Sequence, residues 1–109
     1  MSTYYEVKIG AENQEQADTI LNSLLAKKLV TGGQFIVASA RFLWKGEVHD
    51  MKEYVTITSY TTDKLKEAVM EDVNKTTVEE VPMVTFVAHD NLSQQMRDWI
   101  DATLAQEAL

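Results

Sequence analysis

The side chains in this sequence that suggest metal chemistry are two histidines and the carboxylates near them. Glu47 and His49 are two positions apart in a segment that alternates like a β-strand, so both side chains are expected on one face, within about 7 Å of each other. An imidazole and a carboxylate could supply two ligands of a zinc or copper(II) site, but such a site normally needs three or four. A second copy of the chain would have to supply the remainder. His89 is the other candidate ligand.

Each histidine also has a purely structural explanation. His49 fits a polar residue on a partly exposed strand. His89 ends a predicted strand, and the following Asp90 or Asn91 fits the N-cap of the next helix. The chain contains no Cys, so thiolate ligands, disulfides and thiol nucleophiles are excluded. The metal hypothesis therefore depends on His49, Glu47 and His89.

Two adjacent carboxylates, Glu79 and Glu80, precede the only proline, Pro82. Such a pair can bind a cation, or transfer protons if burial raises one of the two pKa values. A solvated loop explains the same residues without chemistry. The sequence shows no nucleophile elbow, phosphate-binding loop or dinucleotide fingerprint. We therefore predict that the protein is not an enzyme.

The charge balance disfavours one class of partner. Lys and Arg number 10 against 17 Asp and Glu, which gives a net charge of −7. Nucleic acids and anionic membranes select clustered basic residues, and the chain has no basic run. We expect neither partner. The first residues lack the layout of a secretory signal, and no apolar run approaches the roughly 20 residues that cross a bilayer, so we predict a cytoplasmic protein.

The apolar pattern predicts one domain over residues 1–109, with the order β-α-β-β-α-β and a terminal helix. Alternation predicts strands over residues 4–9, 35–44, 47–60 and 83–88. Helical spacing predicts three helices, which start near Asn13, Thr62 and Asn91. Gly32-Gly33 is expected to end the first helix. This order is the ferredoxin-like α+β arrangement, an antiparallel sheet with helices on one face.

A long β-hairpin is predicted at the centre of the chain, with its turn at Lys45-Gly46. Gly suits the second position of a primed two-residue turn, in which both central residues need positive φ. Facing residues then have numbers that sum to 91, which pairs Arg41 with Asp50. One face is expected to cover the helices: Ile36, Ala38, Ala40, Phe42 and Trp44, opposite Met51, Val55 and Ile57. The other face carries Phe35, Val37 and Leu43, opposite Val48, Tyr54 and Thr56.

This second face is too apolar for a sheet surface in water. Arms of roughly 10 to 14 residues also exceed the usual strand length near 5–6, so their edges extend beyond the domain and need covering or pairing with another chain. We therefore predict a homo-oligomer. Its interface is expected to contain Phe35, Val37, Leu43, Val48 and Tyr54. The alternative is a twisted hairpin that folds back on its own domain.

Three short segments, in this order and at these separations, resemble the CutA family of small trimeric proteins associated with divalent-cation tolerance. They are Leu43-Trp44-Lys45-Gly46-Glu47, Glu80-Val81-Pro82 and Asp98-Trp99-Ile100. The resemblance covers nearly the whole chain. It implies a ferredoxin-like fold, a homotrimer, and a role in the tolerance of or response to divalent metal ions, copper in particular.

The chain departs from the family pattern where metal ligands are expected. Family members commonly carry His-Pro-Tyr directly before Glu-Val-Pro, where this chain has Thr77-Val78-Glu79. They also carry a Cys near the second strand, where this chain has Gly32-Gly33-Gln34-Phe35. We therefore expect weak binding of Cu²⁺ or another divalent cation at a subunit interface, or none, and no certain cofactor.

Two other functions stay open at this point. The first is a PII-like trimer that binds a small signalling ligand between its subunits, although the negative charge disfavours an anionic nucleotide. The second is a cofactor-free enzyme of the dimeric α/β-barrel type that uses Tyr4, Tyr54 or His49 in a sheet-lined pocket. The absence of a convergent acid–base set counts against that enzyme.

Overall fold

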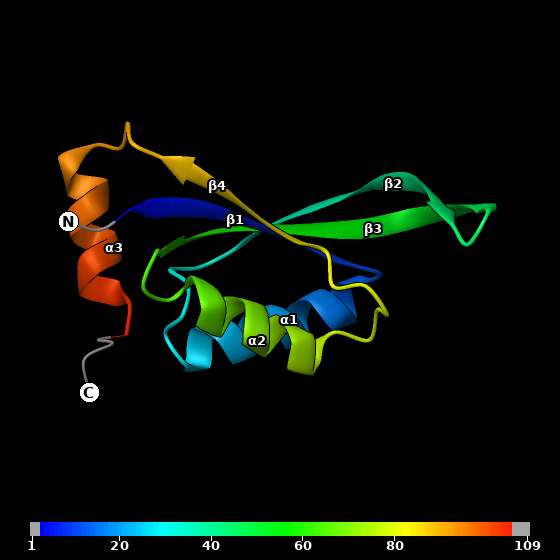
Figure 1. Ribbon diagram of the computed structural model, residues 1–109, viewed down its shortest axis with the longest axis horizontal. Coiled ribbons are helices and arrows are strands. Elements are labelled where there is room, and N and C mark those ends of the chain that lie inside the picture. The colour runs from blue at the N-terminus through cyan, green and yellow to red at the C-terminus, as the bar shows by residue number, and fades with distance from the viewer. Residues whose placement is uncertain (1–2, 106–109) are drawn as a thin grey trace.

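The computed structural model describes residues 3–105, which form a four-stranded antiparallel sheet with two helices on one face and a third helix at one end (Figure 1). The elements are β1 (Tyr4–Ala11), α1 (Gln14–Ala26), β2 (Gln34–Trp44), β3 (Glu47–Thr62), α2 (Lys66–Thr76), β4 (Val84–His89) and α3 (Gln94–Thr103). The strand order is β2-β3-β1-β4. The predicted ferredoxin-like βαββαβ fold with a C-terminal helix and a long central hairpin is confirmed.

The core lies between the sheet and the pair of helices α1 and α2. The helices bury most of the apolar residues that recur at helical spacing: Ala17, Ile20, Leu21, Leu24, Val69 and Val73. Leu25, which the same spacing predicts to be buried, is 38% exposed. The facing strand residues are at most 1% exposed: Val7, Ile9, Ala11, Val55 and Ile57. Burying one such aliphatic side chain contributes about 1.5–3 kcal/mol, so this layer supplies most of the stability of the domain. No helix within residues 3–105 has the length and apolar character needed to span a membrane.

The tip of the hairpin has the predicted register. Arg41 pairs with Asp50, and the Arg41 Nε donates to Asp50 Oδ1 at 2.6 Å. The turn has φ of 49° at Lys45 and 82° at Gly46, the positive values that a primed turn requires. A Cβ added at Gly46 would meet no atom within 4 Å, so the need for Gly here comes from the backbone alone.

Replacing Gly46 with Val should therefore destabilise the turn without any steric clash. A β-branched residue strongly disfavours the left-handed region, and we expect a loss of about 1–2 kcal/mol in the free energy of unfolding. Chemical denaturation measures it. Gly32→Val is the matched control, because Gly32 also has open space around its Cβ position but has no positive φ. An unchanged denaturation midpoint for Gly46→Val would contradict the role given to the turn.

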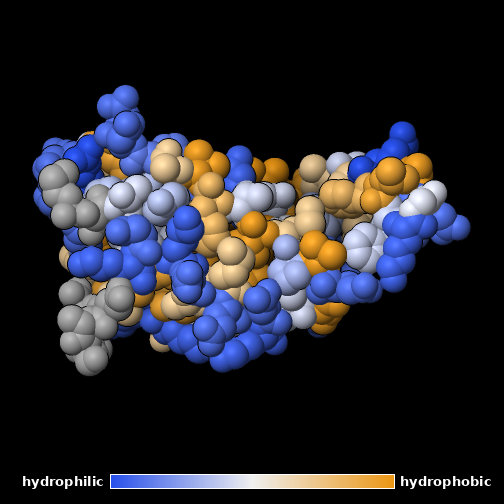
Figure 2. Space-filling model, viewed as in Figure 1, coloured by the Kyte–Doolittle hydropathy of each residue, from blue (hydrophilic) through white to orange (hydrophobic). Residues whose placement is uncertain are grey.

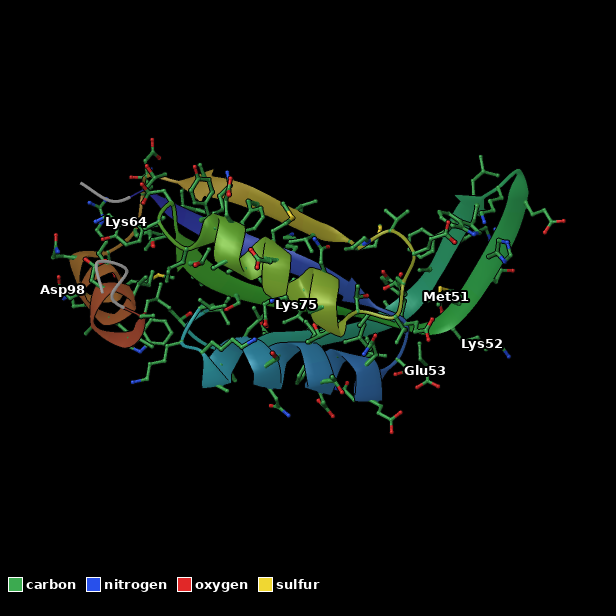
Figure 3. The ribbon with its side chains drawn as sticks, turned by 60° about the horizontal axis from the view of Figure 1, so that its bottom comes forward. Met51, Lys52, Glu53, Lys64, Lys75 and Asp98 are labelled. Carbon is green, nitrogen blue, oxygen red and sulfur yellow. The ribbon has the colours of Figure 1, made fainter. Side chains whose placement is uncertain are left out.

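Nearer the domain the predicted hairpin register is wrong, because β3 contains a bulge. Lys52 and Glu53 together face Ser39, and beyond them Ala38 pairs with Tyr54. An extra residue in one strand shifts its partners by one position and exchanges the faces to which they belong. The distal part of the hairpin also bends away from the rest of the sheet at this point (Figure 3).

The bulge changes which hairpin residues face the helices. Val37 pairs with Val55 and Phe35 with Ile57, so these four side chains share the helix-covered face. The face opposite the helices, which we call the open face, carries Ile36, Ala38, Ala40, Phe42 and Trp44 with Met51 and Tyr54. The prediction that the first five of these cover the helices is wrong. Grouping Tyr54 with Phe35, Val37, Leu43 and Val48 on one face is also wrong.

Helix ends differ from the predictions in three places. Asn13 caps α1 as predicted, and its Oδ1 accepts a hydrogen bond from the Gln16 N–H at 2.8 Å. The helix ends earlier than predicted, at Ala26, and Lys28 adopts the left-handed conformation with φ of 55°. Gly32-Gly33 therefore lies beyond the helix end. The second helix, α2, starts only at Lys66, because β3 continues to Thr62. The N-cap of α3 is Ser93 instead of Asn91: the Ser93 Oγ accepts from the Met96 N–H at 3.1 Å.

The third helix, α3, closes one end of the sheet. The Tyr4 hydroxyl donates to the Asp101 carboxylate at 2.9–3.0 Å, and the Ala105 N–H donates to the Lys28 carbonyl at 2.8 Å. Ile100 is fully buried in this contact. The hairpin tip lies at the opposite end of a molecule that measures 44 × 28 × 22 Å (Figure 1).

Candidate functional site

A cleft of about 500 Å³ lies between the hairpin and the segment that connects α2 to β4. Its apolar lining residues are Phe42, Leu43, Trp44, Met51, Val78, Val81 and Met83. Its polar groups are Glu12, His49, Tyr54, Glu79 and Glu80. Met51 marks the place where the hairpin leaves the sheet (Figure 3). A second hollow of about 580 Å³ shares Phe42, Tyr54 and Met83 and continues along the open face to Lys8 and Thr85.

Tyr54 lies at the junction of the two hollows and is only 8% exposed. Its ring meets the Phe42 ring edge-on at 5.1 Å, and its hydroxyl lies over Gly10, where a Cβ would stand 2.2 Å away. The hydroxyl donates to the two Glu79 carboxylate oxygens at 3.4 and 3.5 Å. Burial, followed by the charge of Glu79, raises the pKa of the Tyr54 phenol well above its ordinary value. Tyr54 is therefore a hydrogen-bond donor in this cleft and a poor base.

The two adjacent carboxylates have different surroundings. Burial raises the pKa of Glu79, the Glu12 charge acts in the same direction, and the Tyr54 hydrogen bond opposes both. Glu80 is 69% exposed, and its Oε1 lies 3.6 Å from the Lys45 Nζ at the hairpin turn. Glu79 and Glu80 therefore differ: Glu79 has a raised pKa and keeps its proton more readily, whereas Glu80 is an exposed carboxylate near the Lys45 ammonium group.

His49 and Glu47 share a strand face, as the sequence predicts. The His49 Nε2 lies 4.0 Å from the Glu47 Oε1, and both side chains are at least half exposed. Together they could give a metal ion one imidazole and one carboxylate from each chain. Their position on the open face follows from the register at the tip.

His89 lies far from this pair. It ends β4, where its Nε2 is 3.2 Å from Glu6 Oε1 and its ring meets the Tyr60 ring edge-on at 6.1 Å. His89 pairs with Tyr4 at the α3 end of the sheet, whereas His49 lies in the distal hairpin, near the opposite end of the molecule. Within residues 3–105, no three His, Cys, Asp or Glu side chains converge on a position that could hold a metal ion.

Two residues near these carboxylates were not identified as functional from the sequence: Glu12, which lines the cleft, and Lys45, whose ammonium group contacts Glu80. Glu12 directly follows β1, and Lys45 had been treated only as a turn residue. Neither belongs to a motif. Their proximity to Glu79 and Glu80 depends on how the connection after α2 crosses the end of β1 towards the hairpin.

Comparison with known proteins identifies the family. A family model described as the CutA1 divalent ion tolerance protein matches residues 6–103. The divalent-cation tolerance protein CutA of Thermotoga maritima is 28% identical over 88 residues, which cover 81% of this chain and 86% of that protein. These matches confirm the resemblance to the CutA family.

Solved structures agree on the fold. The CutA1 protein of Ehrlichia chaffeensis superposes with a TM-score of 0.88 at 19% identity, covering 97% of this chain and 99% of that one. A protein of Archaeoglobus fulgidus described as the periplasmic divalent cation tolerance protein CutA has a TM-score of 0.83 at 24% identity, with 94% and 98% covered. Since the family model spans almost the entire sequence, the chain belongs to the CutA1 divalent ion tolerance family.

Proposed function

We propose that this protein is a homotrimeric divalent-cation tolerance protein that acts by binding ions and not by catalysis. The observation that carries the proposal is the match of the CutA1 divalent ion tolerance family to residues 6–103. Two further features support it: the apolar surface of the hairpin, which favours assembly, and the pairing of His49 with Glu47 on that hairpin, which offers metal ligands.

The proposed trimer interface is the hairpin. Leu43 and Val48 face each other across the arms and are 74% and 65% exposed, and Phe35 and Val37 are also exposed although they lie on the helix side. Apolar side chains gather on the hairpin and over the middle of the molecule (Figure 2). Exposed apolar side chains that cluster on a protruding β-hairpin are typical of surfaces that a partner covers. Tyr54, buried in its own chain, supports Phe42 from the open face.

The proposed metal ligands are His49 and Glu47, with copies of the same pair from neighbouring subunits completing the site. One chain supplies two ligands at a 4.0 Å separation, and copper(II) or zinc normally takes three or four. His89 is the weaker candidate because Glu6 already binds its Nε2. The absence of the family's usual Cys and His residues predicts that affinity is low.

Calorimetric titration of the assembled protein with Cu²⁺ tests this proposal. We expect a dissociation constant weaker than about 10 μM, loss of binding in His49→Ala, and retention in the control His89→Ala. Acidification should weaken binding, because a protonated imidazole cannot ligate. Binding that is lost in His89→Ala but kept in His49→Ala would place the site at the end of β4. No binding by any variant would contradict the metal part of the proposal.

The alternative functions have less support. A PII-like trimer would bind its ligand between subunits. In the cleft beside the hairpin, the carboxylates Glu12 and Glu80 disfavour an anionic nucleotide. An enzyme that uses Tyr54 or Tyr4 as a base is disfavoured because both phenol pKa values are raised, first of all by burial, and both hydroxyls donate to carboxylates. We accordingly propose a protein without catalytic activity.

We also propose a cytoplasmic location. The composition without Cys suits a reducing compartment, although it does not require one. The Archaeoglobus fulgidus relative is described as periplasmic, so location within this family is a property to establish for each member. Fractionation of cells that express the chain without an added signal sequence distinguishes the two compartments.

A further inference from the structure

We propose that the cleft beside the hairpin turn binds an amphipathic organic cation: its primary ammonium group would lie between the Trp44 ring and the Glu80 carboxylate, and its apolar body along the hairpin. This proposal goes beyond divalent-ion tolerance and does not depend on it. It concerns a different chemical class of ligand, and the partners of its ammonium group are Trp44 and Glu80, although His49 lines the same cleft.

The ammonium group of Lys45 occupies the position proposed for the ammonium group of the ligand. The Lys45 Nζ lies 5.4 Å from the centroid of the Trp44 ring and 3.6 Å from Glu80 Oε1. An ammonium within about 6 Å of an indole face is attracted by the ring quadrupole, and a nearby carboxylate adds a Coulomb attraction. Lys45 is 67% exposed, so its ammonium is free to leave, and a ligand amine would then find both partners in place.

The remainder of the cleft suits an apolar body of modest size. Phe42, Met51, Val81 and Met83 provide its wall next to Trp44. Its volume of about 500 Å³ falls within the 300–1,000 Å³ typical of sites for small molecules. Methionine side chains adapt to ligands of different shape, which favours a class of amphipathic amines over one closely fitted molecule.

Among residues 3–105, one chain alone offers a divalent metal ion too few converging ligands in this cleft. Within the described part of the chain no three carboxylates or imidazoles converge, although His49, Glu12, Glu79 and Glu80 all line the cleft. A divalent ion needs several oxygen or nitrogen ligands around one point. An organic ammonium needs one carboxylate and one aromatic face, which is what Glu80 and Trp44 provide. The net charge of −7 also favours the approach of a cation.

Fluorescence titration with 2-phenylethylammonium tests this proposal directly. The chain has two tryptophans, so the Trp99→Phe variant makes Trp44 the only one and its emission the reporter. Titrations are made on the assembled protein with EDTA present, which excludes metal effects, and 2-phenylethanol serves as the neutral isostere. We expect the ammonium to bind at least about fivefold more tightly than the alcohol, which corresponds to a cation–π interaction of roughly 1 kcal/mol. Equal affinities, or no emission change with either probe at millimolar concentration, would overturn the proposal.

Two further variants in the same background separate the ammonium site from general apolar binding. Glu80→Gln should weaken ammonium binding about fivefold and leave alcohol binding unchanged, whereas Glu71→Gln, in an exposed ion pair on α2, should change neither. Lys45→Asn should strengthen ammonium binding, because it removes the competing lysine while Asn-Gly preserves the primed turn. An unchanged ammonium affinity in both Glu80→Gln and Lys45→Asn would overturn the proposal, whatever the Cu²⁺ titration shows.

Discussion

Replacing both Leu43 and Val48 with glutamate is expected to convert the proposed trimer into monomers without unfolding the chain. The two residues face each other at the hairpin tip and are 74% and 65% exposed, so within one chain they contribute little to the fold. Substitutions at such surface positions usually change stability by no more than about 0.5 kcal/mol, and two like charges directly opposite each other add only a modest penalty. In an interface, the same change would bury unpaired carboxylates at a cost of several kcal/mol for each ion.

Light scattering coupled to size-exclusion chromatography measures the effect, and circular dichroism with thermal melting establishes whether the fold persists. Met70→Glu is the control, because Met70 is 41% exposed on α2 and lies away from the hairpin. The wild-type chain and the control should both run as trimers. A wild-type monomer at micromolar concentration would contradict the assembly proposal, and a trimeric double variant would move the interface away from the hairpin tip.

The second large effect is expected at Gly10. A Cβ at this position would stand 2.2 Å from the Tyr54 hydroxyl oxygen and 2.8–2.9 Å from two ring carbons. Because Tyr54 packs on Phe42 and is 8% exposed, its ring has to leave its site to make room. Such overpacking costs about 1–3 kcal/mol, and here the Tyr54–Glu79 hydrogen bond is lost in addition. We therefore expect Gly10→Ala to lower the free energy of unfolding by roughly 2–4 kcal/mol.

Urea denaturation of Gly10→Ala next to Gly32→Ala measures this loss. A Cβ at Gly32 meets nothing within 4 Å, so this control should unfold within about 0.5 kcal/mol of the wild type. The crystal structure of the Gly10 variant should show the Tyr54 ring displaced from the floor of the cleft. Equal stabilities for the two variants would mean that the close approach of Tyr54 to Gly10 is not needed for the fold.

Much of this fold could be predicted from local sequence patterns. Alternation placed β1 and the hairpin arms, helical spacing gave the buried faces of α1 and α2, and Lys45-Gly46 identified the turn. These features depend on periodicity and on local φ preferences, which a single sequence contains. The bulge at Lys52 and Glu53 could not be predicted in this way, since neither residue is a Gly or Pro that would mark an interruption.

The candidate site was predictable only in part. The shared face of Glu47 and His49 followed from strand alternation, and the adjacent carboxylates Glu79 and Glu80 stood out as a pair. The different surroundings of Glu79 and Glu80 could not be predicted, because they depend on Tyr54, Lys45 and Glu12, which are distant along the chain. His89 was predicted as a possible ligand from its type alone, and its distance from His49 became evident only with the strand pairing.

The bulge has one consequence for how this protein could be redesigned. Deleting Lys52 would leave Glu53 opposite Ser39 and would keep the pairs Ala38–Tyr54 and Ala40–Met51, so every side chain would remain on its present face. Only the bend and the extra local twist would disappear. The direction in which the hairpin projects can therefore be altered by chain length, and the exposed Lys52 is the only side chain that is lost. A one-residue deletion thus changes the geometry of the hairpin and leaves each remaining side chain on its face, which side-chain substitutions cannot do.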